Sequence, residues 1–154
     1  MGETIHHIIC GYSGIGKSTA EQRHKNVYDF ESSIFSHKWS AEEGTISRDE
    51  SFPINYIDAI ENHMNEHGVS VYLLSCHQEV RSELQSRGIP YIIVMPEPSL
   101  KEEYIRRWLK RGSSMEFIES MSERWDDMIA SCEADPAPKI HLKQGEYIND
   151  VLPM

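Results

Sequence analysis

Residues 11–18 read Gly11-Tyr12-Ser13-Gly14-Ile15-Gly16-Lys17-Ser18 and match the pattern G-x-x-x-x-G-K-[ST] at every fixed position. The apolar run IHHIIC at residues 5–10 precedes this stretch and predicts a strand, and residues 17–25 are compatible with a helix. A glycine loop between a strand and a helix brings backbone N–H groups and the positive helix end to one point. The stretch therefore predicts an anion-binding loop of the kind that holds phosphates.

The loop predicts both a ligand and a metal ion. Lys17 is expected to reach the β- and γ-phosphates of a nucleotide, and the Ser18 hydroxyl to join the shell of a Mg²⁺ ion. ATP and Mg²⁺ are thus the predicted cofactors. A glycine turn that only caps a helix is the alternative. The residues expected to contact the nucleotide are Gly11, Ser13, Gly14, Ile15, Gly16, Lys17, Ser18 and Thr19.

Strands and helices are expected to alternate after this loop. Short apolar runs predict further strands at residues 27–30, 69–74, 89–94 and 139–143. Helical spacing and capping signals predict helices at residues 55–67, 79–87, from about 99, from about 113 and at 146–152. Residues 36–52 have no sustained period and are expected to be irregular. Nearly continuous apolar strands indicate a three-layer α/β/α sandwich with about five parallel strands.

Composition narrows the class of protein. A length of 154 residues with 39% hydrophobic residues suits one domain with one core. The net charge of −10 disfavours binding to duplex nucleic acid. No run reaches the roughly 18 apolar residues of a membrane span, and the first residues lack a secretory pattern, so a cytoplasmic protein is expected. No H-x-x-x-H pair on a convincing helix face is recognised, and a protein metal cage is not expected.

With these motifs the chain resembles the small P-loop kinases, the group of nucleoside monophosphate, shikimate and gluconate kinases. It looks particularly like short adenylate-kinase-like proteins of phages and bacteria. The resemblance covers most of the length and implies an ATP-dependent phosphotransferase whose first-choice acceptor is a nucleoside or deoxynucleoside monophosphate. It also implies one domain over residues 1–154, with an acceptor-binding excursion at about 34–54 and a helical lid at about 99–132.

The resemblance assigns acidic residues to the acceptor. In this group the second strand often ends in an acid that faces the acceptor, and Asp29 occupies that place here. Asp29 is the candidate that orients or deprotonates the acceptor, directly or through a water of the metal. Glu31 is the alternative because it would share a strand face with Asp29.

The resemblance also implies an arginine-bearing lid. Residues 104–112, YIRRWLKRG, carry four basic residues and no acid in a chain of net charge −10. Arg107 and Arg111 are four residues apart on one helix face, so they are favoured over Arg106 as phosphate contacts. Cations placed at a helix C-terminus for dipole reasons are the alternative.

Other acceptor contacts are less determined. Where many nucleotide kinases carry an aspartate after the third strand, this chain has Ser75-Cys76-His77. Ser75 is a candidate to hold a metal-bound water, and His77 to touch the acceptor. If the acceptor is a monophosphate, Arg48 or Arg81 is expected to bind its phosphate.

Two further functions remain open at this point. One is a kinase for a hydroxyl on a small metabolite or on a polynucleotide 5′ end, and the other is a regulatory module that binds ATP without transferring phosphate. The expected partners are a nucleotide and a small acceptor, without a membrane or duplex nucleic acid. The expected state is a monomer or a homodimer.

Overall fold

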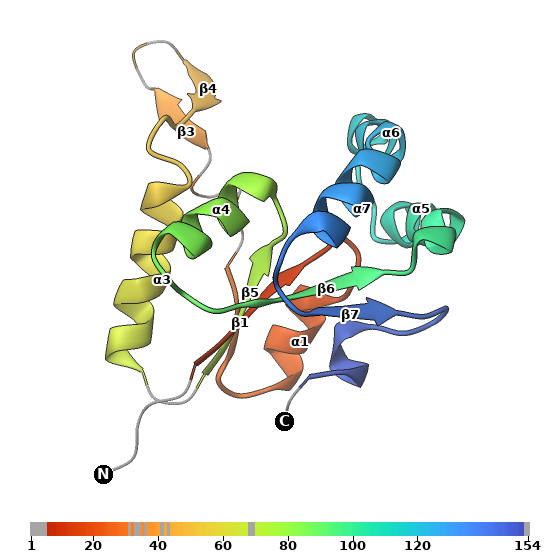
Figure 1. Ribbon diagram of the computed structural model, residues 1–154. Helices are drawn as coiled ribbons and strands as arrows, with labels where there is room; N and C mark the ends of the chain where they lie inside the picture. Colours follow the sequence, from red (N-terminus) through yellow and green to blue (C-terminus); the bar gives the residue numbers. More distant parts are fainter. Residues whose placement is uncertain are drawn as a thin grey trace.

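A computed structural model describes residues 6–30, 32, 35, 37–40, 42, 44–67 and 70–152. Its centre is a five-stranded parallel sheet in the order β2-β5-β1-β6-β7 (Figure 1). The strands are β1 His6–Gly11, β2 Val27–Asp29, β5 Ser70–Ser75, β6 Ile92–Pro96 and β7 Lys139–Leu142. Each supplies apolar side chains to one buried core, as expected for a sheet covered on both faces.

The register brings the carboxyl ends of neighbouring strands together. Gly11 at the end of β1 lies opposite Ser75 of β5 and Val94 of β6, and Asp29 at the end of β2 lies opposite Leu73. Strands β5 and β2 lie on one side of β1 in the sheet, and β6 and β7 lie on the other side. In such open sheets the crevice at the point where the chain changes sides is the usual ligand site.

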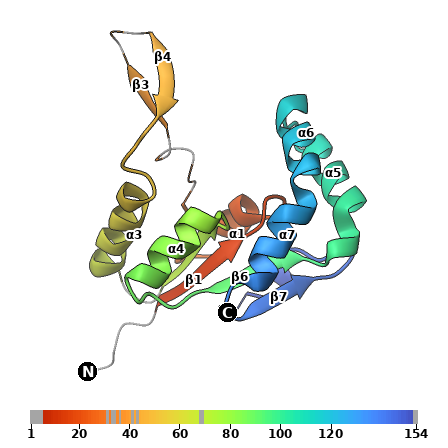
Figure 2. The ribbon, with the colours of Figure 1, turned by 45° about the horizontal axis from the view of Figure 1, so that its top comes forward.

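The helices complete the three layers. Figures 1 and 2 show α1 on one face of the sheet and α4 and α7 on the other. The α-helices in the described residues are α1 Lys17–Arg23, α3 Ile54–Glu66, α4 Gln78–Ser86, α5 Lys101–Lys110, α6 Met115–Glu123 and α7 Trp125–Ala134. Short 3₁₀ turns cover Pro98–Leu100 and Ile148–Asp150. The predicted three-layer α/β sandwich with five parallel strands is therefore confirmed.

Several predicted boundaries are wrong. The segment expected to be irregular forms an antiparallel hairpin of β3 (His37–Ser40) and β4 (Thr45–Arg48), which projects away from the sheet in Figures 1 and 2. The helix expected from about 113 begins at Met115 and is capped by Ser114, whose side chain accepts from the Phe117 N–H. The helix expected from about 99 begins at Lys101, directly after the 3₁₀ turn.

The helical region expected from about 113 does not form one helix. The chain turns at Arg124, so α6 ends at Glu123 and α7 begins at Trp125. The turn lets Trp125 enter the core beside Tyr12 and Trp108, with ring centroids 5.4 and 6.3 Å apart. Aromatic packing from three elements therefore decides where the helix breaks.

In the parts of the chain that the structure describes, every helix is too short or too polar to cross a membrane.

Candidate functional site

The loop of residues 11–18 joins β1 to α1 as predicted. Its start is tied to the sheet because the Tyr12 N–H donates to the Val94 carbonyl at 3.0 Å. Gly14 and Gly16 have φ angles of 95° and 94°, a region that side chains other than glycine rarely occupy. Gly16 is the N-cap of α1, so the loop ends at the positive end of that helix. This geometry is the one an anion-binding loop requires.

Neighbouring side chains crowd the position that a Cβ atom would take at three glycines of this loop. A Cβ on Gly11 would lie 2.5 Å from Ile15 Cδ1, and one on Gly14 would lie 3.0 Å from Trp108 Nε1. On Gly16 it would lie 3.2 Å from the Tyr147 ring. The Trp108 indole also donates to the Ser13 carbonyl at 3.3 Å. The loop is thus held in shape by α5 and by the segment after β7 as well as by its own glycines.

A hollow of about 780 Å³ opens over this loop, and it is called the phosphate hollow below. Lys17 lies in its wall with Nζ donating to the Gly11 carbonyl at 2.9 Å. Ser18 and Thr19 also lie in the wall and are exposed. The full lining is Gly11, Ser13, Gly14, Gly16, Lys17, Ser18, Thr19, Asp29, Ser32, Ser75, Cys76, His77, Arg107, Lys110, Arg111, Phe117, Met121, Met128 and Tyr147. The structure therefore gathers most of the predicted nucleotide contacts at one place, while Ile15 is buried beneath the loop.

The basic end of α5 lies against the loop. The Arg107 guanidinium donates to the Gly14 carbonyl at 3.0 Å, and the Arg111 guanidinium donates to the Ser13 hydroxyl at 2.9 Å. Both arginines line the phosphate hollow together with Lys110, whereas Arg106 is exposed outside its lining. The helix therefore turns Arg107 and Arg111 toward the loop, as their spacing of four residues predicts.

Sequence reasoning missed Tyr147 and the way Arg107 is held. The Arg107 guanidinium lies between two rings, 4.4 Å from the Tyr104 centroid and 3.9 Å from the Tyr147 centroid. It also pairs with Glu103 at 2.6 Å and donates to the Glu146 carbonyl at 2.7 Å. Tyr147 is a lone aromatic residue after a glycine turn, and nothing in its local sequence indicates that it covers the loop.

Asp29 reaches the same hollow from the sheet. It ends β2 and lies in the wall of the phosphate hollow, and its own N–H donates to the Glu21 carboxylate at 2.7 Å. Glu31, the alternative acid, lies outside the described residues. Ser32 follows as a buried lining residue.

The end of β5 adds Ser75 and His77 to the wall. Ser75 Oγ is buried, and within the described residues no group hydrogen-bonds to it. His77 precedes α4. Partial removal of its ring from water disfavours the charged imidazolium and so lowers the pKa of His77. Lys17, Arg124 and Arg48 lower this pKa further, and Glu79 opposes them. His77 is thus a neutral imidazole with cations around it at neutral pH.

The residues fit a magnesium ion that is carried by phosphates. Among the described residues no three His, Cys, Asp or Glu side chains gather to hold a metal, as a cage of protein ligands would require. Mg²⁺ commonly keeps several waters and binds through one or two protein oxygens plus phosphates. The Ser18 hydroxyl, the Asp29 carboxylate and the unpaired Ser75 hydroxyl, all in the wall of the phosphate hollow, are such oxygens.

The two arginines expected to bind an acceptor phosphate lie elsewhere. Arg48 on β4 is exposed and pairs with Glu79 at 2.8 Å. Arg81 on α4 is buried and pairs with Asp135 at 2.8 Å, and it also donates to the Cys76 carbonyl and to Ser131. Neither belongs to the lining of the phosphate hollow. Arg81 is therefore engaged in a buried ion pair, contrary to its prediction as a phosphate ligand.

One histidine pair contradicts the expectation from the sequence. His63 and His67 are four residues apart on the face of α3 and its end, and their rings stack with centroids 3.7 Å apart. His63 Nδ1 is 2.7 Å from the Tyr72 hydroxyl. The pair was not recognised from the sequence, and it packs on the aromatic edge of the sheet.

Comparison with protein-family models finds no match for this chain, and comparison with curated proteins finds none either. Among solved structures, a tunicamycin resistance protein of Deinococcus radiodurans shares the fold. The two structures have a TM-score of 0.58 and 16% sequence identity over 97% of this chain and 91% of that one. At this identity the likeness concerns the fold.

Together, the strand order, the glycine loop before α1 and this likeness define a three-layer α/β fold with a glycine-rich loop between its first strand and its first helix.

Proposed function

We propose that the protein is an ATP-dependent phosphotransferase that acts on a small acceptor. The observation that supports this best is the phosphate hollow, where the anion-binding loop, Lys17, the basic end of α5 and Asp29 share one cavity. A glycine turn that only caps a helix has no need of cations from a distant helix at its mouth. Phosphoryl transfer needs positive charge around the transferred group and exclusion of water, and this arrangement suits both needs.

The roles follow from position. The N–H groups of the loop and the Lys17 ammonium bind the β- and γ-phosphates, and Arg111 and Lys110 add positive charge where α5 meets the loop. Mg²⁺ on the phosphates, with Ser18, neutralises charge on the transferred group. Asp29 orients the acceptor and takes its proton if the acceptor is a hydroxyl. Glu31 remains the alternative acid.

The adenine base of ATP has a suitable place beside Tyr147. Its ring packs on Gly16 and on the Arg107 guanidinium and is partly exposed in the wall of the phosphate hollow. A flat ring and a guanidinium side by side favour stacking with a purine. We therefore assign the adenine to the segment of residues 143–147.

Three versions of this function differ in the acceptor. A nucleoside monophosphate is the expectation from the resemblance, a hydroxyl on a small metabolite or a polynucleotide 5′ end is the second, and an ATP-binding regulatory module is the third. The acidic surface disfavours a long nucleic acid. We propose that the protein acts in the cytoplasm, as a monomer or homodimer, on small diffusible molecules.

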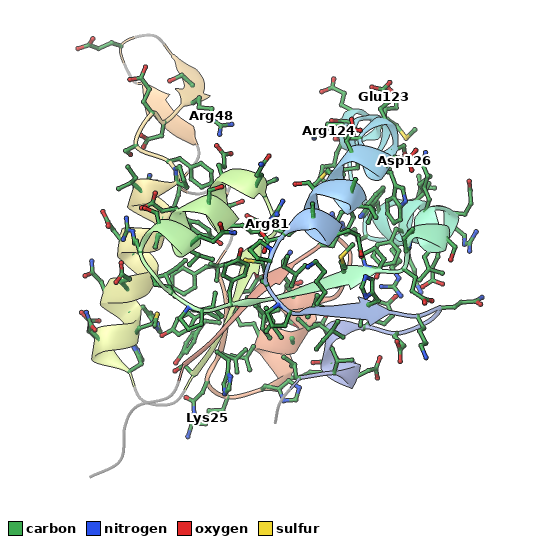
Figure 3. All side chains as sticks on the ribbon, viewed as in Figure 1. Lys25, Arg48, Arg81, Glu123, Arg124 and Asp126 are labelled. Carbon is green, nitrogen blue, oxygen red and sulfur yellow. The ribbon has the colours of Figure 1, made fainter. Side chains whose placement is uncertain are left out.

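A transfer assay with γ-labelled ATP tests the proposal. The panel comprises the nucleosides, their monophosphates, simple sugars, oligonucleotide ends and tunicamycin, the last because the protein of similar fold is a tunicamycin resistance protein. Lys17→Ala is expected to abolish transfer with an unchanged melting temperature. Lys25→Ala, an exposed lysine after α1 that is labelled in Figure 3, is the matched control and is expected to retain it.

Two outcomes contradict the proposal. Transfer that survives Lys17→Ala would show that the loop is not the phosphate site. ATP binding with micromolar affinity and no transfer to any acceptor would favour the regulatory module.

A further inference from the structure

A second hollow of about 420 Å³ adjoins the phosphate hollow between the start of α4 and the start of α7. The two share Cys76, His77 and Met128 in their walls. The hollow that contains Lys17 and Asp29 therefore adjoins the second hollow. Its lining is Cys76, His77, Gln78, Glu79, Arg81, Arg124, Asp127, Met128 and Ser131. If the protein transfers phosphate, the second hollow is where the acceptor binds.

The charges of the second hollow balance one another. Arg81 pairs with the buried carboxylate of Asp135, so its charge is neutralised within the protein. Glu79 pairs with Arg48, which reaches it from the hairpin. Arg124 and Asp127 are the two remaining charged groups of the lining, one of each sign. Figure 3 shows that Arg48, Arg81 and Arg124 come from three separate elements around this region.

The balance distinguishes this hollow from its neighbour. The lining of the phosphate hollow carries Lys17, Arg107, Lys110 and Arg111 and a single acid, Asp29, so its charge is strongly positive. A phosphate dianion needs several charge-assisted hydrogen bonds from cations that are not already neutralised. In the second hollow it would lie beside the carboxylates of Glu79 and Asp127, and the neutral His77 would add no charge.

Hydroxyl groups suit the same lining better. The carboxylates of Glu79 and Asp127 accept hydrogen bonds from hydroxyls, and the Arg124 guanidinium, Gln78 amide and Ser131 hydroxyl donate to ring or hydroxyl oxygens. Most of these groups are exposed to solvent, so a polar, uncharged ligand replaces water without leaving a buried charge unpaired.

We propose that the second hollow binds an uncharged, hydroxyl-rich acceptor such as a sugar or a nucleoside, and that it does not take a nucleoside monophosphate. This inference rests on the proposed phosphotransfer and replaces the acceptor that the resemblance implies. A hydroxyl oxygen of the acceptor forms the new bond to the γ-phosphorus, and the bond from that phosphorus to the bridging oxygen of ATP breaks. The hydroxyl proton goes to Asp29, and ADP leaves.

Dinucleotides that join two sites test the exclusion of a monophosphate. In P1,P5-linked compounds, adenosine and a second nucleoside are joined through five phosphates, so the molecule fills both sites of a nucleotide kinase. Calorimetry on the full chain is expected to show that such compounds, with adenosine, uridine, guanosine or thymidine as the second nucleoside, bind no more tightly than the P1,P4-linked compounds of the same nucleosides, which are one phosphate shorter. A Kd at least about tenfold lower for any P1,P5 compound than for its P1,P4 counterpart would overturn the inference and leave phosphotransfer intact. An absence of ATP binding would overturn both.

A pair of neighbouring acids tests the hollow itself. Asp127 lines the second hollow, whereas Asp126 stands one position earlier in the same first turn of α7 and lies outside the lining. Asp127→Asn is expected to raise the KM for the hydroxyl acceptor found in the transfer panel by about tenfold, with the KM for ATP unchanged. Asp126→Asn changes the same charge near the same helix end and is expected to leave both constants unchanged.

The remaining outcomes are decisive as well. Equal effects of Asp126→Asn and Asp127→Asn would assign the change to the helix end and contradict the inference. Transfer to monophosphates but to no nucleoside or sugar would also contradict it, while still supporting phosphotransfer.

Discussion

Arg81 of α4 and Arg107 of α5 are the two arginines whose side chains are most enclosed among the ion pairs described here, with 4% and 8% of their surface exposed. Arg81 meets the carboxylate of Asp135, which is itself 2% exposed and also accepts from the Tyr91 hydroxyl. Arg107 pairs with Glu103, and it also donates hydrogen bonds to the carbonyls of Gly14 in the glycine loop and of Glu146.

The difference separates a structural arginine from one that shapes the site. Arg81 joins the end of β5, α4 and the end of α7, and its charge is neutralised by the buried carboxylate of Asp135. Arg107 joins α5 to the loop and places Tyr147 over Gly16. Enclosure alone therefore does not tell the two apart, and the atoms that each guanidinium contacts do.

The largest effect is expected where the Arg81 pair is broken. Asp135→Ala leaves a guanidinium buried without its carboxylate, so the free energy of unfolding in urea is expected to fall by about 3–5 kcal/mol. The double variant Arg81→Met/Asp135→Leu removes both charges and is expected to recover most of this loss. A double variant as unstable as the single one would show that the ion pair itself stabilises the fold.

A smaller loss of stability with a larger loss of binding is expected at the other arginine. Arg107→Ala removes the hydrogen bonds to the carbonyls of Gly14 and Glu146 and the ion pair with Glu103, at a cost of about 2 kcal/mol in urea unfolding. Because the loop loses its support, the Kd for ATP is expected to rise about tenfold. The Arg81→Met/Asp135→Leu variant is expected to bind ATP as the wild type does. An equal loss of ATP affinity in this variant and in Arg107→Ala would contradict the distinction between the two arginines.

Low pH is expected to reduce the stability that the Arg81–Asp135 ion pair contributes to the fold. Burial raises the pKa of Asp135, but the Ala137 N–H, the Arg81 guanidinium and the Tyr91 hydroxyl lower it below the ordinary value of 3.8. The unfolded chain then binds a proton more readily than the folded protein, so the stability from this group is complete well above pH 3.8 and is lost as the pH falls through the lowered pKa. Urea unfolding at pH 7 and pH 3 measures the loss.

The matched control for acid is the double variant without either charge. The difference in unfolding free energy between the two pH values is expected to be smaller in Arg81→Met/Asp135→Leu than in the wild type. A difference of the same size would mean that other carboxylates account for the acid sensitivity.

The smallest effect is expected next to Arg107. Arg106 has the same charge one position earlier, is exposed, and lies outside the phosphate hollow. Arg106→Ala is expected to change the free energy of unfolding by less than about 0.5 kcal/mol and to leave the Kd for ATP unchanged. An effect equal to that of Arg107→Ala would show that ATP affinity depends on the positive charge of α5 and not on the contacts that Arg107 makes.

Local patterns predicted the parts of the fold that depend on near neighbours in the chain. The glycine loop, β1 and the start of α1 follow from a short motif, and the parallel sheet follows from apolar runs. The spacing of Arg107 and Arg111 also predicted that they share one helix face, and the structure shows that both contact the loop. The hairpin at β3 and β4 was missed because its residues show no clear alternation.

Contacts between distant residues were beyond those patterns. Arg81 and Arg48 look like free cations in the sequence, and their partners are 54 and 31 residues away. The break at Arg124 depends on the burial of Trp125 against Tyr12, more than a hundred residues earlier. Tyr147 meets the loop only because β7 lies at the edge of the sheet beside β6.

The order of residues alone determined that a glycine-rich loop stands between a strand and a helix in an α/β protein, because backbone geometry and glycine freedom act over a few neighbouring residues. Only the tertiary structure decided which cations face the loop, which are neutralised by buried or surface acids, and that the space beside His77 carries balanced charge. The charge of a side chain is written in the sequence, but its partner and its exposure to water are set by packing.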